Sequence, residues 1–246
     1  MSNGSLSTAM SEAERIIFLK PITPFDHLGA NDLAWVAKDF RVRLFRKQEL
    51  IFQQGETNRE VYVIVRGKVR IFKNSLAGHE TSINISSTGA LIGEFAPIDG
   101  QPRSASAVAL EECLLLEMRG ENFERHMHDR PGLALGVAKI LTHKIRLTAT
   151  YAETIAQHDA AGRLMHILLL YNEEFGKEIE AGKRYTLNLR LNQEDLASLV
   201  GTRRENINRI LRDWHKRGLI EYKDGEFIFL DLPTVKQERD ALKSEA

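Results

Sequence analysis

The chain has 246 residues, enough for two ordinary domains, and 43% of them are hydrophobic, enough for a substantial core. Lys+Arg and Asp+Glu are balanced at 34 each, so bulk charge does not indicate a nucleic-acid binder and any basic surface must be local. No apolar run approaches the roughly 18 residues of a membrane span, and a single cysteine, Cys113, excludes an intramolecular disulfide and suits a reducing cytoplasm.

Residues 1–17 lack the apolar segment of a signal peptide and are predicted to be a flexible arm. From about Val42 to Met118, short apolar runs are separated by turn signals at 55–58, 74–78, 87–89 and 98–102. Many short strands at this spacing favour a sandwich or barrel over a parallel sheet. Four glycines are expected at corners that need φ > 0 or a close backbone approach: Gly55, Gly67, Gly89 and Gly93.

The stretch IGEFAPIDGQPRSA, residues 92–105, is unusually polar for a turn between strands. It sets Glu94 nine residues before Arg103, with the hydroxyl of Ser104 alongside. A core has little use for these groups together, whereas a small anionic ligand that carries hydroxyls could use all of them. The alternative is that Glu94 and Arg103 pair with each other at a turn and bind nothing.

His126-Met127-His128 resembles the start of a cupin metal motif. No glutamate follows at cupin spacing, so we expect exposed histidines there and no metal site. A lone loop histidine, His79, does not indicate a haem ligand. The sequence contains no nucleophile–base constellation, so we do not expect an enzyme.

After Pro131 a proline-free run rich in helix formers predicts a long helix over residues 131–158. Its apolar positions recur at alternating steps of three and four, forming a heptad seam of Ala138, Leu141, Ile145, Thr148, Ala152 and Ile155. Such a helix could pack on its own domain. A narrow seam on a long helix favours pairing with a second copy, so we expect a homodimer.

Residues 159–246 are predicted to form a small helical domain closed by a wing. The run after Asp159 predicts an amphipathic helix that ends at Gly176, and Asp224-Gly225 between two short apolar runs predicts a hairpin. Between them lie a short helix, a turn at Gly201 and a second helix, which is the spacing of a helix-turn-helix. Three residues are expected on the inward face of the second helix: Ile207, Ile210 and Leu211.

The outward positions of that second helix carry groups that contact DNA: Arg203, Arg204, Glu205, Asn208, Arg209 and Arg212. Residues 182–223 contain ten Lys/Arg and five Asp/Glu, a local excess of positive charge such as phosphate contacts require. The alternative is a solvated helix with ordinary surface charge. The glycine turn, the apolar spacing and the following wing together favour binding to double-stranded DNA.

From about Phe18 to Leu232 the sequence resembles the CRP/FNR family of bacterial transcription regulators, most specifically in IGEFAPIDGQPRSA and VGTRRENINRIL. The resemblance implies an α+β fold. It would comprise an N-terminal antiparallel β-roll like those that bind cyclic nucleotides (18–130), a long dimerisation helix (131–158) and a C-terminal winged helix-turn-helix (159–246).

In the members of the family that bind cyclic AMP, the pair matching Gly93-Glu94 holds the ribose 2′-hydroxyl. The pair matching Arg103-Ser104 binds the cyclic phosphate. The resemblance therefore implies cyclic AMP, or another cyclic nucleotide, as a non-covalent effector. The same pattern also occurs in members that work without cyclic AMP.

Aligning the long helix on Gly162-Arg163 places Thr148 on the threonine that contacts adenine. At the next position many cyclic-AMP binders have a serine that reaches across the dimer, and this chain has Ala149. The resemblance also implies that the ligand rotates the DNA-binding domains about a hinge near His158-Asp159.

Arg204, Glu205 and Arg209 match the base-reading residues of the family, which implies a palindrome with TGTGA-like half-sites. At position 203 the chain has arginine where the cyclic-AMP receptor has serine, and a phosphate contact would explain it. The implied protein is a cytoplasmic, homodimeric, sequence-specific DNA-binding regulator, with RNA polymerase as a further partner. One alternative is a regulator of the same fold that uses no cyclic nucleotide. Another is a nucleotide-sensing module that acts on protein, which the helix-turn-helix disfavours.

Overall fold

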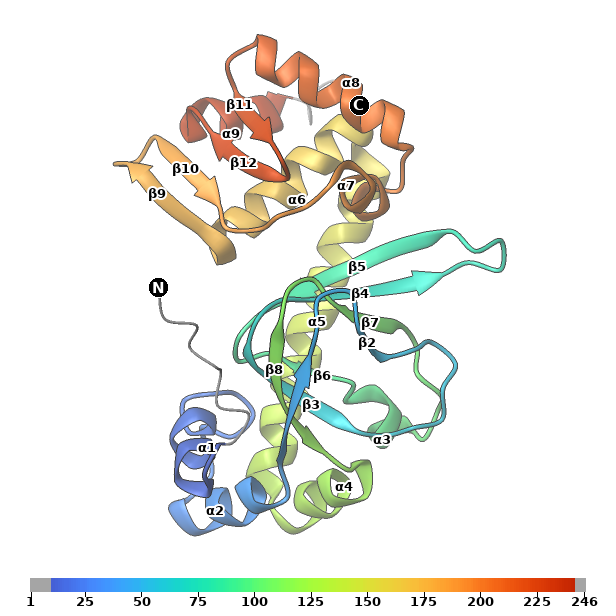
Figure 1. Ribbon diagram of the computed structural model, residues 1–246, viewed down its shortest axis with the longest axis vertical. Coiled ribbons are helices and arrows are strands. Elements are labelled where there is room, and N and C mark those ends of the chain that lie inside the picture. The colour runs from blue at the N-terminus through green and yellow to red at the C-terminus, as the bar shows by residue number, and fades with distance from the viewer. Residues whose placement is uncertain (1–9, 242–246) are drawn as a thin grey trace. The chain divides into compact units, whose positions relative to one another are not determined.

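The computed structural model describes residues 10–241 (Figure 1). The chain divides into two compact units between Ile145 and Arg146, inside helix α5 (Pro131–Gln157). The long helix predicted over 131–158 is therefore present, and its two parts belong to different units. Within the described residues, no helix combines the length and the apolar character needed to cross a bilayer.

The first unit begins with two helices, α1 (Glu12–Leu19) and α2 (Ala30–Lys38). Ser11 caps α1, because its hydroxyl accepts from the Glu14 amide while the Glu14 carboxylate accepts from the Ser11 amide. At the end of the helix, Leu19 is fully buried in the core. The flexible arm predicted over 1–17 is therefore wrong from Glu12 onward, because the capping box and the buried leucine hold this segment as a helix. Residues 1–9 lie outside the described residues.

Two four-stranded antiparallel sheets form the body of the first unit, in agreement with the predicted sandwich or barrel. One sheet has the order β1-β8-β3-β6, with bounds Arg41–Phe45, Cys113–Met118, Val61–Arg66 and Leu91–Ile92. The other has the order β2-β7-β4-β5, with bounds Leu50–Phe52, Ser106–Ala109, Val69–Asn74 and Glu80–Ser86. Two further helices belong to this unit, α3 (Phe95–Asp99) and α4 (Gly120–Asp129).

The central strand β3 is buried on both of its faces. Val61 and Val63 belong to a core with residues of the helices, including Leu19, Val36, Phe123 and Leu133. Tyr62 and Ile64 belong to a second core with residues of the other sheet, including Phe52, Val69 and Ala107. Because successive strand residues point to opposite faces, a strand between two cores needs an apolar side chain at each position. This explains the uninterrupted run VYVIV.

The second unit contains helices α6 (Ala160–Phe175), α7 (Gln193–Val200), α8 (Arg204–Lys216) and α9 (Leu232–Ala241). Its sheet has the order β11-β12-β10-β9, with bounds Ile220–Lys223, Glu226–Phe229, Arg184–Leu187 and Gly176–Glu180. The predicted helix end at Gly176 is confirmed. The wing hairpin is also confirmed, since Asp224 and Gly225 adopt φ values of 52° and 81° between β11 and β12. Strand β9 and helix α9 were not predicted.

The four glycines expected at corners all have positive φ, from 79° at Gly93 to 98° at Gly67. Two of them differ in the space around them. A Cβ on Gly67 would lie 2.5 Å from the Sγ of Cys113 and 2.9 Å from the carbonyl oxygen of Glu112, whereas a Cβ on Gly55 would meet nothing within 4 Å. Both positions require the left-handed conformation, and at Gly67 there is also no space for a side chain.

We predict that Gly67→Ala destabilises the protein more than Gly55→Ala. The left-handed backbone costs an L-residue about 1–2 kcal/mol at either position. Crowding against Cys113 and Glu112 adds about 1–3 kcal/mol at Gly67 alone. Urea unfolding of both variants measures the difference. Equal losses would show that the close contact at Gly67 relaxes at no cost.

Candidate functional site

The polar turn between Gly93 and Ser104 connects β6 to β7 around the short helix α3. Glu94 stands at the N-cap position of α3 without a capping hydrogen bond from its side chain, and Gly100, at φ 69°, ends the helix in the left-handed conformation. At Gly93 the backbone passes so close to Arg103 that a Cβ would lie 2.7 Å from its Nη1. The two ends of the predicted motif therefore meet in space.

Arg103 is buried, with 3% of its surface exposed. Its guanidinium donates to Asn58 Oδ1, to the Gly93 carbonyl and to the Glu60 carbonyl, each at 2.7 Å. It also lies over the ring of Phe52, 4.3 Å from the centroid. Burial lowers the pKa of the guanidinium, while Tyr62 and nearby carboxylates oppose the shift. Sequence reasoning placed Arg103 outside the core, and this was wrong, because the side chain is buried and its donors satisfy backbone carbonyls of partly buried residues. Its contact with a ligand phosphate stays a prediction.

Glu94 is buried as well, and its partner is Lys144 of α5. The Nζ of Lys144 donates to Glu94 Oε1 at 2.6 Å and to the Leu91 carbonyl at 3.1 Å. The hypothesis that Glu94 and Arg103 pair with each other is therefore wrong. The Glu94 carboxylate bonds to Lys144, and the Arg103 guanidinium donates to Asn58 and to two backbone carbonyls. Sequence reasoning missed Lys144, although this cation stands four residues before Thr148, on the same side of the helix.

Ser104 and Thr148 differ in setting from the buried pair of charges. Ser104 is exposed beside Arg103 in the first unit. Thr148 is exposed on the part of α5 that belongs to the second unit. The contribution of both residues to a ligand site stays a prediction.

Helix α8 presents one buried face and one exposed face. Ile207, Ile210 and Leu211 are buried as predicted, together with Trp214. The preceding helix α7 ends at Gly201, which adopts φ 66° and allows the tight turn. Of the predicted DNA contacts, Asn208 is half-buried and the others are exposed: Arg203, Arg204, Glu205, Arg209 and Arg212.

Two polar residues that the sequence reasoning missed orient the exposed face of α8. Arg209 donates to Asn206 Oδ1 at 2.8 Å, and Asn206 in turn donates to the Thr202 hydroxyl at 3.0 Å. The spacing of three and four residues along a helix was the available signal. This chain of hydrogen bonds limits the rotamers of Arg209 before any ligand binds.

Of the two histidines on α4 that were expected to be exposed, only His128 is exposed. His126 is 3% exposed, so the expectation of two exposed histidines was wrong. The ring nitrogens of His126 contact Asp39 Oδ2 at 2.8 Å and the Arg130 guanidinium at 3.0 Å. Burial lowers the pKa of His126 and Asp39 opposes the shift. Within residues 10–241 no group of three or more His, Cys, Asp or Glu side chains could hold a metal ion.

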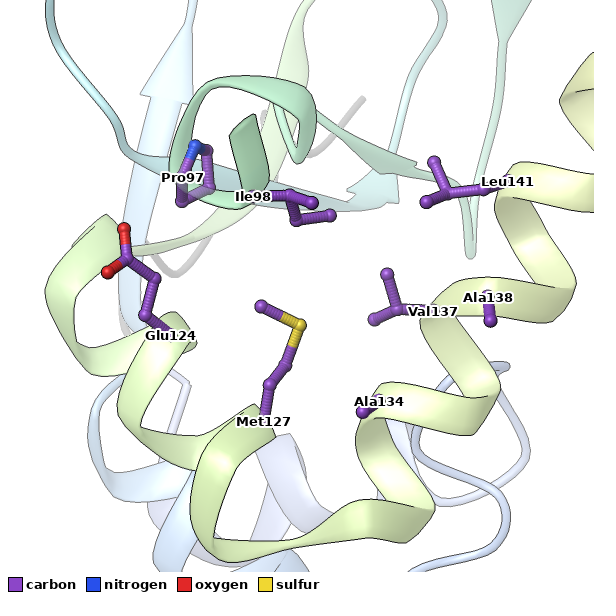
Figure 2. A pocket seen from close by; sticks show the side chains of 8 residues that line it. All are labelled: Pro97, Ile98, Glu124, Met127, Ala134, Val137, Ala138 and Leu141. Atoms are coloured by element: carbon purple, nitrogen blue, oxygen red, sulfur yellow. The ribbon is translucent and has the colours of Figure 1, made fainter. Parts of the chain in front are cut away.

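The predicted seam of α5 is largely uncovered. Ile145 is 69% exposed and Ile155 is 47% exposed, and Leu141 is half-buried. Beside the first turns of the seam, an apolar hollow opens between α3, α4 and α5 (Figure 2). Its lining includes Ala138 and Leu141 of the seam, facing Ile98 and Met127.

Comparison with known proteins decides the family. A cyclic nucleotide-binding domain matches residues 42–130, and a Crp-like helix-turn-helix domain matches residues 162–237. The chain belongs to the CRP/FNR family of DNA-binding transcription regulators. The two matched regions lie in the first and the second unit, in the order that the resemblance implied.

Three known members of the CRP/FNR family illustrate the similarity. The CRP-like cAMP-activated global transcriptional regulator of Mycobacterium tuberculosis is 27% identical over 84% of this chain and 92% of its own. The cyclic AMP receptor protein of Thermus thermophilus is 28% identical over 82% of this chain and 89% of its own. The structure of FixK2 from Bradyrhizobium japonicum matches with a TM-score of 0.71 and covers 80% of this chain and 96% of its own. At 18% sequence identity, this match shows the fold alone.

We predict that Arg103→Ala destabilises the protein in the absence of any ligand. The substitution removes the donors of the partly buried Gly93 and Glu60 carbonyls, at about 1–3 kcal/mol for each carbonyl that stays unpaired. Ser104→Ala is the matched control, because its exposed hydroxyl should change the free energy of unfolding by less than about 0.5 kcal/mol. Urea unfolding of both variants tests this. Unchanged stability in Arg103→Ala would mean that water replaces the guanidinium freely.

Proposed function

We propose that this chain is a cytoplasmic, homodimeric regulator that binds a TGTGA-like palindrome and is gated by a cyclic nucleotide such as cyclic AMP. The observation that carries the proposal is the exposed face of α8, the helix that follows the turn at Gly201. Arg204, Glu205 and Arg209 are exposed on this face. RNA polymerase is the further partner that such a regulator would contact.

The chemistry of α8 suits base edges in a major groove. Arginine donates bidentately to guanine O6 and N7, and glutamate accepts from cytosine N4. Arg204 and Glu205 occupy the first turn of α8, the end of a recognition helix that contacts bases. Asn206 holds the guanidinium of Arg209, which lowers the entropy lost when that side chain binds a base.

The homodimer is supported by the exposed seam of α5. An isolated helix has no reason to carry apolar residues at heptad spacing on a face that water covers. Ile145 and Ile155 are the large apolar members of this face, and the small residues Ala138 and Ala152 would let two helices approach closely. A second copy of α5 is the partner that this pattern fits.

Gating by a cyclic nucleotide is supported by Glu94 and Arg103 on one turn, and by relatives whose names state activation or reception of cyclic AMP. Glu94 is already bonded to Lys144, so a ribose hydroxyl would share or replace that bond. Three of the five N–H donors of the Arg103 guanidinium bond to protein acceptors. The remaining donors suit a phosphate oxygen.

A regulator of the same fold without a cyclic nucleotide is the second candidate. The internal partners of Glu94 and Arg103 favour it, because they satisfy both charges in the protein alone. The absence of the serine hydroxyl at Ala149 favours it as well. The helix-turn-helix disfavours a module that acts only on protein.

We predict that calorimetry detects cyclic AMP binding, and that Ala149→Ser tightens it. A neutral hydrogen bond contributes about 0.5–1.5 kcal/mol, which corresponds to a dissociation constant about 2- to 12-fold lower. Cyclic GMP serves as the comparison ligand, since it changes the base alone. Absence of heat with both nucleotides would favour the second candidate, and weaker binding by Ala149→Ser would indicate a pocket shaped for another ligand.

We predict that binding-site selection on randomised DNA yields paired TGTGA-like half-sites, centred roughly 34 Å apart, one helical turn. Glu205→Ala should relax the preference at one base pair of each half-site, by about 1–3 kcal/mol of discrimination. Lys216→Ala is the control: as a phosphate contact, it should weaken all sequences alike and reduce the salt slope by about one. An unpaired motif, or a motif unchanged in Glu205→Ala, would overturn the proposed DNA recognition.

A further inference from the structure

The last third of α5 carries a second stripe, distinct from the exposed seam. Thr154 and His158, the residue after the helix, are 4% and 8% exposed, and Tyr151 is half-buried. These positions are separated by three and four residues, so they share one side of the helix. All three belong to the second unit, together with the helix-turn-helix. This part of α5 is therefore packed into the DNA-binding unit.

The stripe contacts the helix-turn-helix through a hydrogen bond of Tyr151. Its hydroxyl donates to the Leu199 carbonyl at 2.5 Å. Leu199 is the last residue but one of α7, where carbonyls have no partner within their own helix. Burial raises the pKa of the Tyr151 hydroxyl, so the group stays protonated and remains a donor near neutral pH. Tyr151 thus caps α7 from a position 48 residues earlier in the chain.

This bond spans the junction at which a hinge was expected. The junction His158-Asp159 lies between α5 and α6, and Tyr151 and Leu199 lie on opposite sides of it in the chain. Asp159 caps α6 by accepting from the Gly162 amide at 2.9 Å. A rotation of α6 and α7 about this junction would pull the hydroxyl away from the carbonyl. While the bond is formed, it opposes rotation of the helix-turn-helix relative to the end of α5.

We propose that Tyr151 is the positioning residue that couples α5 to the helix-turn-helix, and that its bond to Leu199 carries part of the coupling between effector and DNA. The inference rests on the proposed function. Thr148, the expected adenine contact, lies one turn before Tyr151 on α5, and α7 packs on the recognition helix α8. A displacement of α5 at the effector would reach α8 through Tyr151 and α7.

The test replaces Tyr151→Phe in the full-length protein, with Tyr222→Phe as the matched control. Tyr222 also lies in the second unit, is also half-buried, and also donates to a backbone carbonyl, that of Leu191 at 2.9 Å. Its bond connects the wing to the segment before α7 and does not involve α5. Both variants lose one hydroxyl and one hydrogen bond, so a purely structural effect should appear in both.

The first measurement is the ratio of affinities for the selected palindrome with and without cyclic AMP. Tyr151→Phe should bring this ratio about fivefold closer to one, the equivalent of one neutral hydrogen bond. The base preference within the half-site should stay that of the unmodified protein, because no base-contacting residue changes. Tyr222→Phe should leave the ratio unchanged. A ratio unchanged in Tyr151→Phe, or lowered equally in both variants, would overturn the inference.

The second measurement needs no effector and separates this inference from the proposed function. Amide hydrogen exchange in residues 146–157 and 193–202 should become about fivefold faster together in Tyr151→Phe. In Tyr222→Phe the segment 146–157 should exchange as in the unmodified protein. If cyclic AMP has no effect on DNA binding, the gating proposal fails. Faster exchange in both segments would still support Tyr151 as the residue that couples α5 to the helix-turn-helix. Unchanged exchange in residues 146–157 of Tyr151→Phe would overturn it.

Discussion

The buried guanidinium of Arg103 is the interaction on which the turn between β6 and β7 depends. Removing a full charge from water costs several kcal/mol, and the structure offsets that cost with three hydrogen bonds and the ring of Phe52. Two of those acceptors are backbone carbonyls on separate segments, at Glu60 before β3 and at Gly93 after β6. The cation therefore ties together the segments that define the turn. A ligand phosphate would meet a donor already held in position, which reduces the ordering cost of binding.

The second buried charge, Glu94, gives the turn its connection to α5. Its partner Lys144 lies on the helix, so the carboxylate links the turn to the element that also carries the seam. A buried carboxylate that lost this cation would need another donor. Any ligand that bonds to Glu94 therefore acts on the contact between the turn and the helix. The ion pair between Glu94 and Lys144 therefore makes the position of α5 depend on the bonding of this carboxylate.

Helix α5 serves three purposes with different faces. Its first part packs through Leu133 and Val137 into the core of the first unit. Its seam is exposed and suits a second copy, while Tyr151 and Thr154 bind it into the second unit. One continuous helix can do this because 3.6 residues per turn distribute neighbouring positions around its axis. A substitution on α5 should therefore be interpreted by its face.

The sequence by itself determined the features that depend on neighbouring residues. Asp224-Gly225 specified a hairpin, Gly201 a turn between two helices, and the positions from Ala138 to Ile155 a helix with a seam, because backbone sterics and periodicity act over a few residues. Only the tertiary structure decided the partners of the buried polar groups. Arg103 and Asn58 are 45 residues apart, Glu94 and Lys144 are 50 apart, and His126 and Asp39 are 87 apart. No local pattern encodes such pairs, because each forms only after packing has removed water from both groups.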